Sequence, residues 1–384
     1  MLRRIDKSPV ATWWWTVDRW FLAAFLSLMG LGIILSFAAS PAVAERIGLD
    51  TFHFATRQIM FMIPALLALL AVSFLTPRQV RRLALIMLGV GLVAMVAVLF
   101  IGLEAKGARR WISLGGLSIQ PSEFLKPAFV VMSAWLFSEQ KRGTIPGTLL
   151  SIGLLGLVLA LLVAQPDLGQ TMLTLGTWGV MFFLAGMSWF WIVLFGGVGI
   201  VGGAFAYTMF DHVQSRIDRF LSGEGDNYQV TMGRDALVNG GFFGVGPGEG
   251  LYKKSIPDSH ADFVFSVAGE EYGLIVCMGI AFIFAFIVLR GMMFALREHD
   301  EFTRLSVAGL VTVFGLQAFI NMGVNLQILP AKGMTLPFIS YGGSSLIAIA
   351  ISMGMVLALT RSSPERLKNI RLTATPRGAL APAE

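Results

Sequence analysis

Three basic side chains lie just before a tryptophan in a polar stretch of this chain: Lys106, Arg109 and Arg110 precede Trp111. A guanidinium group can hold a phosphate through two parallel hydrogen bonds, so this group could bind a phosphate-bearing lipid headgroup. The structural alternative is that an arginine beside an interfacial tryptophan only anchors a helix end at the membrane surface.

A second polar stretch follows, in which Glu123 and Lys126 are three residues apart and so share one face of a helix. They come after Gln120 and Pro121, a pattern typical of a helix start with proline in the first turn. A charged group at the centre of a membrane helix costs roughly 2.5–3.5 kcal/mol on insertion scales. The structural alternative to a functional pair is therefore a self-neutralising pair that helps the helix to insert.

Two aspartates, Asp167 and Asp262, each stand where an apolar run begins. Asp167 follows Gln165 and Pro166, and an acidic residue in the first turn of a helix favours the helix dipole. Asp262 comes directly before Phe263, and aspartate is a favoured N-cap residue. Both aspartates are candidates for chemistry at a helix mouth, and both have a purely structural alternative.

Two polar stripes step by four residues, which is the spacing of one helix face. The stripes are Asp262–Ser266–Glu270 and Gln317–Asn321–Asn325. Polar stripes in a membrane bundle face its interior or a cavity, so we expect the first stripe to do so, and Glu271 is a further ionisable residue beside it. Hydrogen bonding between helices is the structural alternative for the second stripe.

Several classes of function are disfavoured. Cys277 is the only cysteine and cannot form an intramolecular disulfide, and the four histidines have no zinc-site spacing. No Walker A sequence is present, and the glycine-rich stretch 240–250 lacks the strand and helix context of a dinucleotide site. These glycines instead favour tight turns and close backbone approach. The net charge of +6 comes from loop Arg and Lys residues, which set membrane orientation and do not indicate nucleic-acid binding.

The elements that must position these groups are membrane helices. The chain is 55% hydrophobic and 14% charged, whereas about a quarter of the residues in a soluble domain are charged. A membrane span needs about 20 apolar residues. Runs of that length fall near 19–40, 57–75, 83–103, 122–138, 146–164, 167–186, 189–210, 263–290, 303–328 and 337–360. The sequence therefore predicts an all-α integral membrane protein with about ten transmembrane helices in one domain, residues 19–360.

The distribution of lysine and arginine predicts the orientation. These residues are more frequent in the N-terminus, alternate loops and C-terminal tail than in the opposite loops, so the positive-inside rule places both termini in the cytoplasm. Residues 1–18 would be a cytoplasmic segment and residues 361–384 a basic, disordered cytoplasmic tail. The largest loop, 211–262, would lie outside the cytoplasm between the seventh and eighth helices, and long loops in compact chains are often functional.

Several motifs occur in a specific order along the chain. They are Gly107-Ala108-Arg109-Arg110-Trp111-Ile112, Gln120-Pro121-Ser122-Glu123 with Lys126, Gln165-Pro166-Asp167-Leu168-Gly169, Tyr228-Gln229, Pro257 to Phe263, and Leu336-Pro337-Phe338-Ile339-Ser340-Tyr341-Gly342-Gly343-Ser344-Ser345. With this ordered set the chain resembles the SEDS family of peptidoglycan polymerases over nearly its whole length. The stretch from Asn321 to Ser345 is more similar to the cell-division branch, as in alphaproteobacteria, than to the elongation branch. Gln170 departs from the family pattern, which usually has threonine there.

The resemblance implies that the chain polymerises lipid II into glycan strands on the outer face of the bacterial inner membrane, at the division septum. The donor is a growing glycan on undecaprenyl pyrophosphate, and the acceptor is the 4-hydroxyl of the GlcNAc of lipid II. This inverting β-1,4 transfer would use one positioned base, because a sugar hydroxyl is a poor nucleophile, and the candidate is Asp262. A helix N-terminus would make that carboxylate a weaker base, so Asp262 could instead orient the hydroxyl or hold a divalent ion.

Positive charge near the pyrophosphate leaving group should lower the barrier, and the candidates are Arg109, Arg110 and Lys126, with Arg216 or Arg219 secondary. The other candidate substrate-binding residues come from the matching motifs: Gln120, Glu123, Asp167, Tyr228, Gln229, His260 and Ser344. No cofactor is expected with certainty. A Mg²⁺ or Mn²⁺ ion could share the work at the pyrophosphate, although the sequence has no dense carboxylate cage.

The resemblance also implies partners: lipid II and the nascent glycan strand, a class B penicillin-binding protein that crosslinks the strand, and other divisome membrane proteins. Two alternatives stay open. A lipid II flippase would carry ionisable groups through the membrane depth and an internal repeat. A non-catalytic scaffold for the transpeptidase would tolerate the loss of Asp262.

Overall fold

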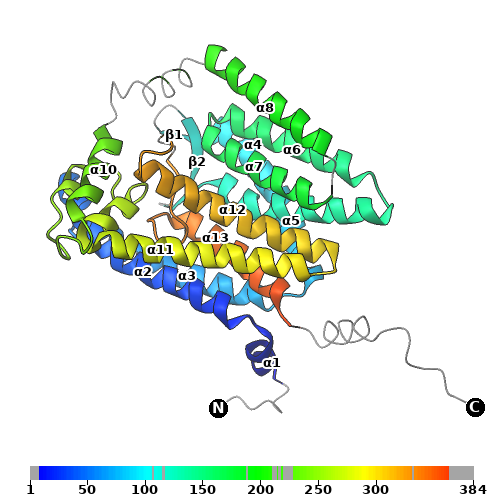
Figure 1. The fold of residues 1–384 in the computed structure, drawn as a ribbon, viewed down its shortest axis with the longest axis horizontal. Coiled ribbons are helices and arrows are strands. Elements are labelled where there is room, and N and C mark those ends of the chain that lie inside the picture. Colours follow the sequence, from blue (N-terminus) through cyan, green and yellow to red (C-terminus); the bar gives the residue numbers. More distant parts are fainter. Residues whose placement is uncertain are drawn as a thin grey trace, which may run out of the picture.

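The structure, a computed structural model, consists mainly of α-helices (Figure 1). It describes residues 8–105, 108–114, 117–186, 189–209, 228–330 and 333–362, together with 214 and 218. The helices are α1 (Pro9–Thr16), α2 (Arg19–Arg46), α3 (His53–Ser73), α4 (Pro77–Ile101), α5 (Pro121–Arg142), α6 (Gly147–Ala164), α7 (Leu168–Leu184), α8 (Trp189–Met209), α10 (Tyr228–Gly240), α11 (Val264–Arg297), α12 (Glu301–Asn325) and α13 (Gly343–Thr360). Strands β1 (Leu103–Ala105), β2 (Ala108–Leu114) and β3 (Leu117–Ile119) form an antiparallel sheet in the order β1-β2-β3.

Each of the ten predicted apolar runs falls on one of these helices. Within the described residues, seven helices are long and apolar enough to cross a membrane: α2, α3, α4, α6, α11, α12 and α13. The chain is therefore a multi-pass membrane protein. The other three runs fall on α5, α7 and α8, and the count of ten spans stays a prediction. The last predicted run begins too early, because residues 336–340 form a hydrogen-bonded turn before α13 starts at Gly343.

The described ends of the chain lie together at one end of the helix bundle. In Figure 1, α1 and the end of α13 lie at the opposite end from β1, β2 and α10. The N–H of Ser362 donates to the carbonyl of Thr16 at 3.0 Å, which joins the two ends. The predicted large loop contains α10 and a short 3₁₀ turn, η1 (Tyr252–Ser255). Which membrane face each end occupies stays a prediction, and the tail from residue 363 onward lies outside the described residues.

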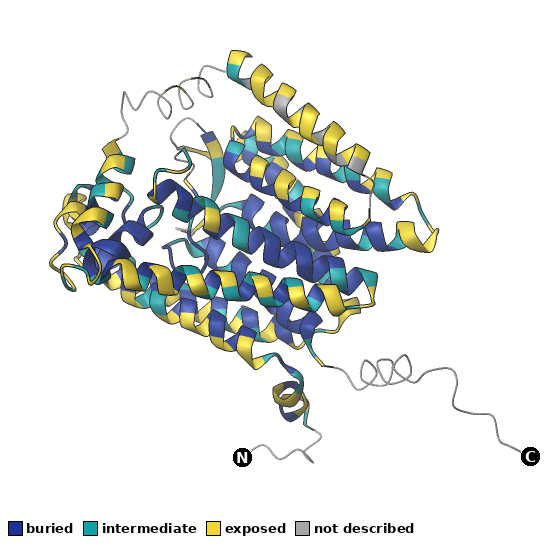
Figure 2. Cartoon of the chain, viewed as in Figure 1, coloured by how far each residue is buried: buried dark blue, intermediate teal, exposed yellow. Residues whose placement is uncertain are grey.

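Two helices form the centre of the bundle. Figure 2 shows that α12 and α13 are mostly buried, whereas the described side chains of α8 are mostly exposed. α12 packs against α5, α7, α11 and α13, and α13 also packs along α3. The polar stripe of α12 therefore lies inside the protein, where hydrogen-bonding groups need protein partners.

The starts of three helices test the capping predictions. Pro121 occupies the first turn of α5, as expected. Asp167 is the N-cap of α7 and accepts the N–H of Gln170 at 3.2 Å, so it stands one position before the first turn in which the sequence placed it. Asp262 is not the N-cap of α11, because that position belongs to Phe263 and the helix begins at Val264.

α11 is broken at Gly273, whose backbone dihedrals are not helical (φ 78°, ψ −178°). The glycine-rich chain after α10 fills the break. The N–H of Val245 donates to the carbonyl of Glu270 at 2.9 Å, and the N–H of Gly246 donates to that of Glu271 at 3.1 Å. These glycines therefore allow close backbone approach, as predicted.

The side chains at the break anchor η1. The Glu270 carboxylate accepts the N–H groups of Tyr252 and Lys253 at 2.7 and 2.9 Å. Glu271 forms a buried ion pair with Lys253, whose ammonium also donates to the carbonyl of Ala38 on α2. Glu270 and Glu271 thus hold the large loop in place. Of the predicted stripe, Ser266 and Glu270 are buried in the interior and Asp262 is partly exposed.

Substituting Gly273 should weaken the fold. We expect Gly273→Ala to lower the free energy of unfolding by at least about 1–3 kcal/mol, because positive φ strains an alanine. Its Cβ would also lie 2.4 Å from the nitrogen of Gly244 and the carbonyl oxygen of Phe242. Gly279→Ala on the same helix is the matched control, since its Cβ would meet nothing within 4 Å. Thermal unfolding midpoints in detergent provide the measurement, and equal midpoints for both variants would contradict the prediction.

Candidate active site

The first group of candidate residues joins β2 to the start of α7. The guanidinium of Arg110 donates to the carbonyls of Gln165 (3.3 Å) and Pro166 and lies 3.6 Å from the Asp167 carboxylate. The amide of Gln120 reaches the same carboxylate at 3.5 Å. Asp167 is buried, whereas Arg110 is partly exposed, so Arg110 presents positive charge at the surface while neutralising a buried aspartate.

The second group is the predicted pair on α5. Glu123 and Lys126 are both buried, and their carboxylate and ammonium lie 2.8 Å apart. The amide of Gln170 on α7 donates to the other oxygen of Glu123 at 2.7 Å. Gln170, the departure from the family pattern, therefore ties α7 to the ion pair, and its own N–H connects the pair to Asp167.

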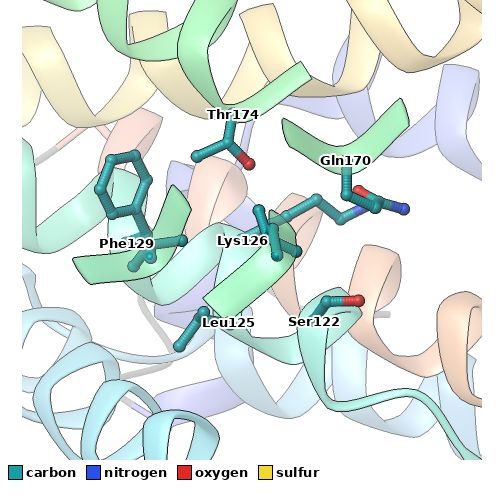
Figure 3. A pocket seen from close by; sticks show the side chains of 8 residues that line it. Ser122, Leu125, Lys126, Phe129, Gln170 and Thr174 are labelled. Carbon is teal, nitrogen blue, oxygen red and sulfur yellow. The ribbon is translucent and has the colours of Figure 1, made fainter. Parts of the chain in front are cut away.

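A small pocket lies beside this pair, between α5, α6 and α7. Figure 3 shows Lys126 extending toward Gln170, with Ser122 nearby and Phe129 on the opposite side of the pocket. The remaining lining is mostly apolar, from Leu125, Val158 and Leu162, with Thr174 as a further polar group. The ion pair thus borders an amphipathic space within the bundle.

The polar connection continues from α5 to α12. The Lys126 ammonium donates to Gln317 at 2.8 Å, and the Gln317 amide donates to the carbonyl of Thr335 at 3.0 Å. The next residue of the stripe, Asn321, donates to the carbonyl of the adjoining Met334 at 2.6 Å. Side chains of α12 therefore link the ion pair to the segment before α13.

The same stripe reaches Asp262. The main-chain carbonyl of Asp262 accepts hydrogen bonds from the side-chain amides of Asn321 at 2.9 Å and Asn325 at 3.0 Å. Its N–H donates to the carbonyl of Asp258 at 3.1 Å, which closes the turn before α11. Asp262 is partly exposed, and it therefore stands on a tightly held turn with access to the surroundings. A Cβ on Gly333 would lie 3.5 Å from its carboxylate.

Other side chains surround this turn. The ring of His260 lies against that of Phe54, tilted by 33° with a centroid distance of 4.1 Å, and both rings contact Tyr341. The N–H of Tyr341 donates to the carbonyl of His260 at 3.0 Å, and Arg46 at the end of α2 donates to the carbonyl of Pro257. Sequence reasoning missed Arg46, Phe54 and Tyr341 as neighbours of Asp262, because no local spacing connects them to it.

The remaining predicted residues are less closely joined to these groups. Arg109 is half-exposed and pairs with Glu104 at 3.4 Å. Ser344 accepts the N–H of Gln120 at 3.2 Å. Tyr228 and Gln229 begin α10, with Tyr228 half-exposed. Lys106, Arg216 and Arg219 lie outside the described residues.

The arrangement offers a carboxylate on a turn and cationic groups on β2, joined by a buried polar network through α7, α5 and α12. Such a site can accept a proton from a hydroxyl and neutralise an anionic group. Among the described residues, no group of three or more His, Cys, Asp or Glu side chains could hold a metal ion.

Comparisons with known proteins agree on one family. Residues 19–365 match the family described as cell cycle protein, FtsW/RodA/SpoVE. A probable peptidoglycan glycosyltransferase FtsW from Caulobacter vibrioides is 46% identical over 94% of this chain and 93% of its own length. The corresponding protein of Geobacter metallireducens is 36% identical over 89% of this chain and 94% of its own length.

Solved structures show the same fold. Rod shape determining protein RodA of Thermus thermophilus matches with a TM-score of 0.67 and 28% identity, covering 90% of this chain and 97% of RodA. A chain from a structure on polymerization and crosslinking by a peptidoglycan synthase complex matches with a TM-score of 0.74 and 27% identity, with the same coverage.

Breaking the buried ion pair should destabilise the protein. We expect Lys126→Met to lower the free energy of unfolding by about 3–5 kcal/mol, because Glu123 would keep a buried charge without its counter-ion. Glu123→Gln combined with Lys126→Met should recover much of this loss. Lys141→Met is the control, since exposed Lys141 on the same helix pairs with Glu301 and such pairs contribute about 0–1 kcal/mol. Unfolding followed by circular dichroism would test this, and a double variant no more stable than Lys126→Met would refute it.

Proposed function

The chain belongs to the cell cycle protein family of FtsW, RodA and SpoVE, and we propose that it works as a lipid II polymerase of the division septum with Asp262 as its base. It is a peptidoglycan glycosyltransferase of the FtsW type, the activity named for its relatives. The observation that carries the assignment of the site is the position of Asp262. Its carboxylate stands on a partly exposed turn whose main chain is fixed by α12.

The proposed reaction forms one glycosidic bond and breaks one bond to phosphate. The 4-hydroxyl of the GlcNAc of lipid II attacks the anomeric carbon of the growing glycan from the face opposite to the pyrophosphate. The Asp262 carboxylate accepts the hydroxyl proton as the bond forms. Undecaprenyl pyrophosphate leaves with the electrons of the broken carbon–oxygen bond, so the α-linked donor gives a β-1,4 product.

The leaving group needs positive charge, and the two arginines of β2 are the best placed candidates. Arg109 is half-exposed and pairs only loosely with Glu104 at 3.4 Å. Arg110 is partly exposed beside Asp167. Lys126 is buried against Glu123 and Gln317, so its proposed role is to balance charge behind the arginines. A Mg²⁺ or Mn²⁺ ion bound through substrate phosphates would supply further charge neutralisation.

The setting of the reaction follows from the same proposal. Lipid II carries its sugars at the headgroup level, so Asp262 and the β-sheet would face the outer side of the inner membrane. A class B penicillin-binding protein would crosslink the strand that this chain makes. One solved relative belongs to a complex in which polymerization and crosslinking are coordinated, and this supports the partner proposal.

A flippase or a scaffold would use the same fold differently. A flippase needs a polar route through the bundle, whereas the polar network here is closed by buried hydrogen bonds between α5, α7 and α12. A scaffold would need no carboxylate at residue 262. Polymer synthesis from purified lipid II therefore separates the polymerase from the other two functions.

The test compares wild type with Asp262→Asn, each with its transpeptidase partner. We expect Asp262→Asn to lose at least about a hundredfold in polymer formation, since general base catalysis typically contributes 10²–10⁴-fold. Asp50→Asn, at an exposed carboxylate between α2 and α3, should match wild type. Glycan strands resolved by gel electrophoresis give the readout. Equal polymer from Asp262→Asn would remove Asp262 from catalysis, and an inactive wild-type complex would favour the flippase or scaffold.

A further inference from the structure

We propose that Asn321 and Asn325 on α12 are positioning residues that hold the turn of Asp262 in its reactive place. This inference rests on the proposed role of Asp262 as the base. Both asparagines act through the main chain of Asp262, and Asn325 also acts through the first turn of α11.

The first observation is a double hydrogen bond to one carbonyl. The side-chain amides of Asn321 and Asn325 donate to the main-chain oxygen of Asp262 at 2.9 and 3.0 Å. Asn325 also donates to the carbonyl of Asn321 at 2.9 Å, which couples the two side chains. Both are buried, with 2% and 0% exposure. A carbonyl held by two buried donors has little freedom to shift, so α12 fixes the position of this turn.

The second observation is a helix cap supplied by a neighbouring helix. Phe263, the N-cap of α11, makes no side-chain capping bond. The N–H of Ser266, the third residue of α11, instead donates to Oδ1 of Asn325 at 3.1 Å, and the Ser266 hydroxyl donates to the same oxygen at 2.7 Å. N–H groups in the first turn of a helix lack acceptors within that helix. Asn325 therefore performs the capping function that a residue of the turn would normally perform.

This cap bears on the chemistry of Asp262. A carboxylate that caps a helix is stabilised as an anion and becomes a weaker base. Here the neutral amide oxygen of Asn325 accepts the N–H and the hydroxyl of Ser266, so α12 supplies an acceptor for the first turn of α11, and the N-cap position belongs to Phe263. The arrangement places a carboxylate near a helix start without making it the cap.

The same face of α12 also positions the segment beside the carboxylate. Asn321 donates to the carbonyl of Met334 at 2.6 Å, and Gln317 donates to that of Thr335 at 3.0 Å. These residues follow Gly333, where a Cβ would lie 3.5 Å from Oδ2 of Asp262. One row of amides thus sets the spacing between the catalytic turn and the chain that borders its carboxylate.

The experiment measures initial rates of polymerisation at varied lipid II concentration for the complex with its transpeptidase partner. The variants are Asn321→Leu, Asn325→Leu and both together, with Asp262→Asn as the reference for loss of the base. Thr312→Val is the matched control, because this buried threonine of α12 bonds only within its own helix in the described contacts, to Ala308 at 2.7 Å. Thermal unfolding of each purified variant measures folding separately.

We expect each single variant to lower kcat by roughly 10- to 100-fold with KM within about twofold, because a displaced catalytic group loses rate while substrate binding persists. The double variant should lose more than either single variant, and Thr312→Val should keep the wild-type kcat. If Asn325→Leu does not fold, Asn321→Leu still tests the inference, because it keeps the cap on Ser266.

Several outcomes would overturn the inference. Wild-type kcat in both asparagine variants would do so, as would a loss that appears only in KM or only in the folded fraction. Wild-type rates for the asparagine variants together with an inactive Asp262→Asn would overturn the inference alone. A wild-type rate for Asp262→Asn would overturn the proposed function of the site as well.

Discussion

A buried ammonium must be neutralised and hydrogen-bonded, and in this protein that requirement falls on Lys126. Its charge is balanced by Glu123 on the same helix, and its remaining donors reach Gln317 on α12. Because Glu123 in turn accepts from Gln170 on α7, the three helices α5, α7 and α12 cannot shift independently without unpairing a buried polar group. Arg110 and Asp167 attach β2 to α7, and the amides of α12 hold the Asp262 turn. The position of β2 relative to this turn therefore depends on the Glu123–Lys126 ion pair.

Burial separates the residues of the site into a structural group and a group that can meet substrate. Residues deep in the bundle satisfy one another, as Glu123, Lys126 and Gln317 do, whereas Asp262 and the two arginines of β2 keep partial exposure at one end of the bundle. A glycosyltransferase that takes a membrane-anchored substrate needs its reacting groups near the headgroups and its rigidity further inside. The polar network supplies that rigidity, because every amide of the α12 stripe bonds to a main-chain carbonyl of a segment bordering the site.

Local spacing predicted much of this, and contacts between distant residues could not be predicted. The Glu123–Lys126 pair follows from a three-residue step on one helix, the position of Asp167 at a helix start from the apolar run that follows it, and the close backbone approach from the glycine-rich stretch. In contrast, nothing in the local pattern links Gln317 to Lys126 or Asn325 to Ser266, which are far apart in the chain. The structural alternative for Asp262, an N-cap, was wrong, since Phe263 holds that position and Asn325 accepts the N–H of Ser266 in the first turn. The three-stranded sheet was also not foreseen, because its strands are short and two of them contain only three residues.

The break at Gly273 constrains how the protein is made. The carbonyls of Glu270 and Glu271 are completed by N–H groups of the preceding loop, and the N–H of Leu274 is completed by the carbonyl of Gly241. In hydrocarbon, such groups without partners are costly, so the residues of α11 around Gly273 cannot settle in the bilayer as an isolated span. The loop that precedes α11 must fold back against them to complete their hydrogen bonds. Assembly of this protein therefore has an order, in which folding of the glycine-rich loop accompanies or precedes completion of a membrane helix.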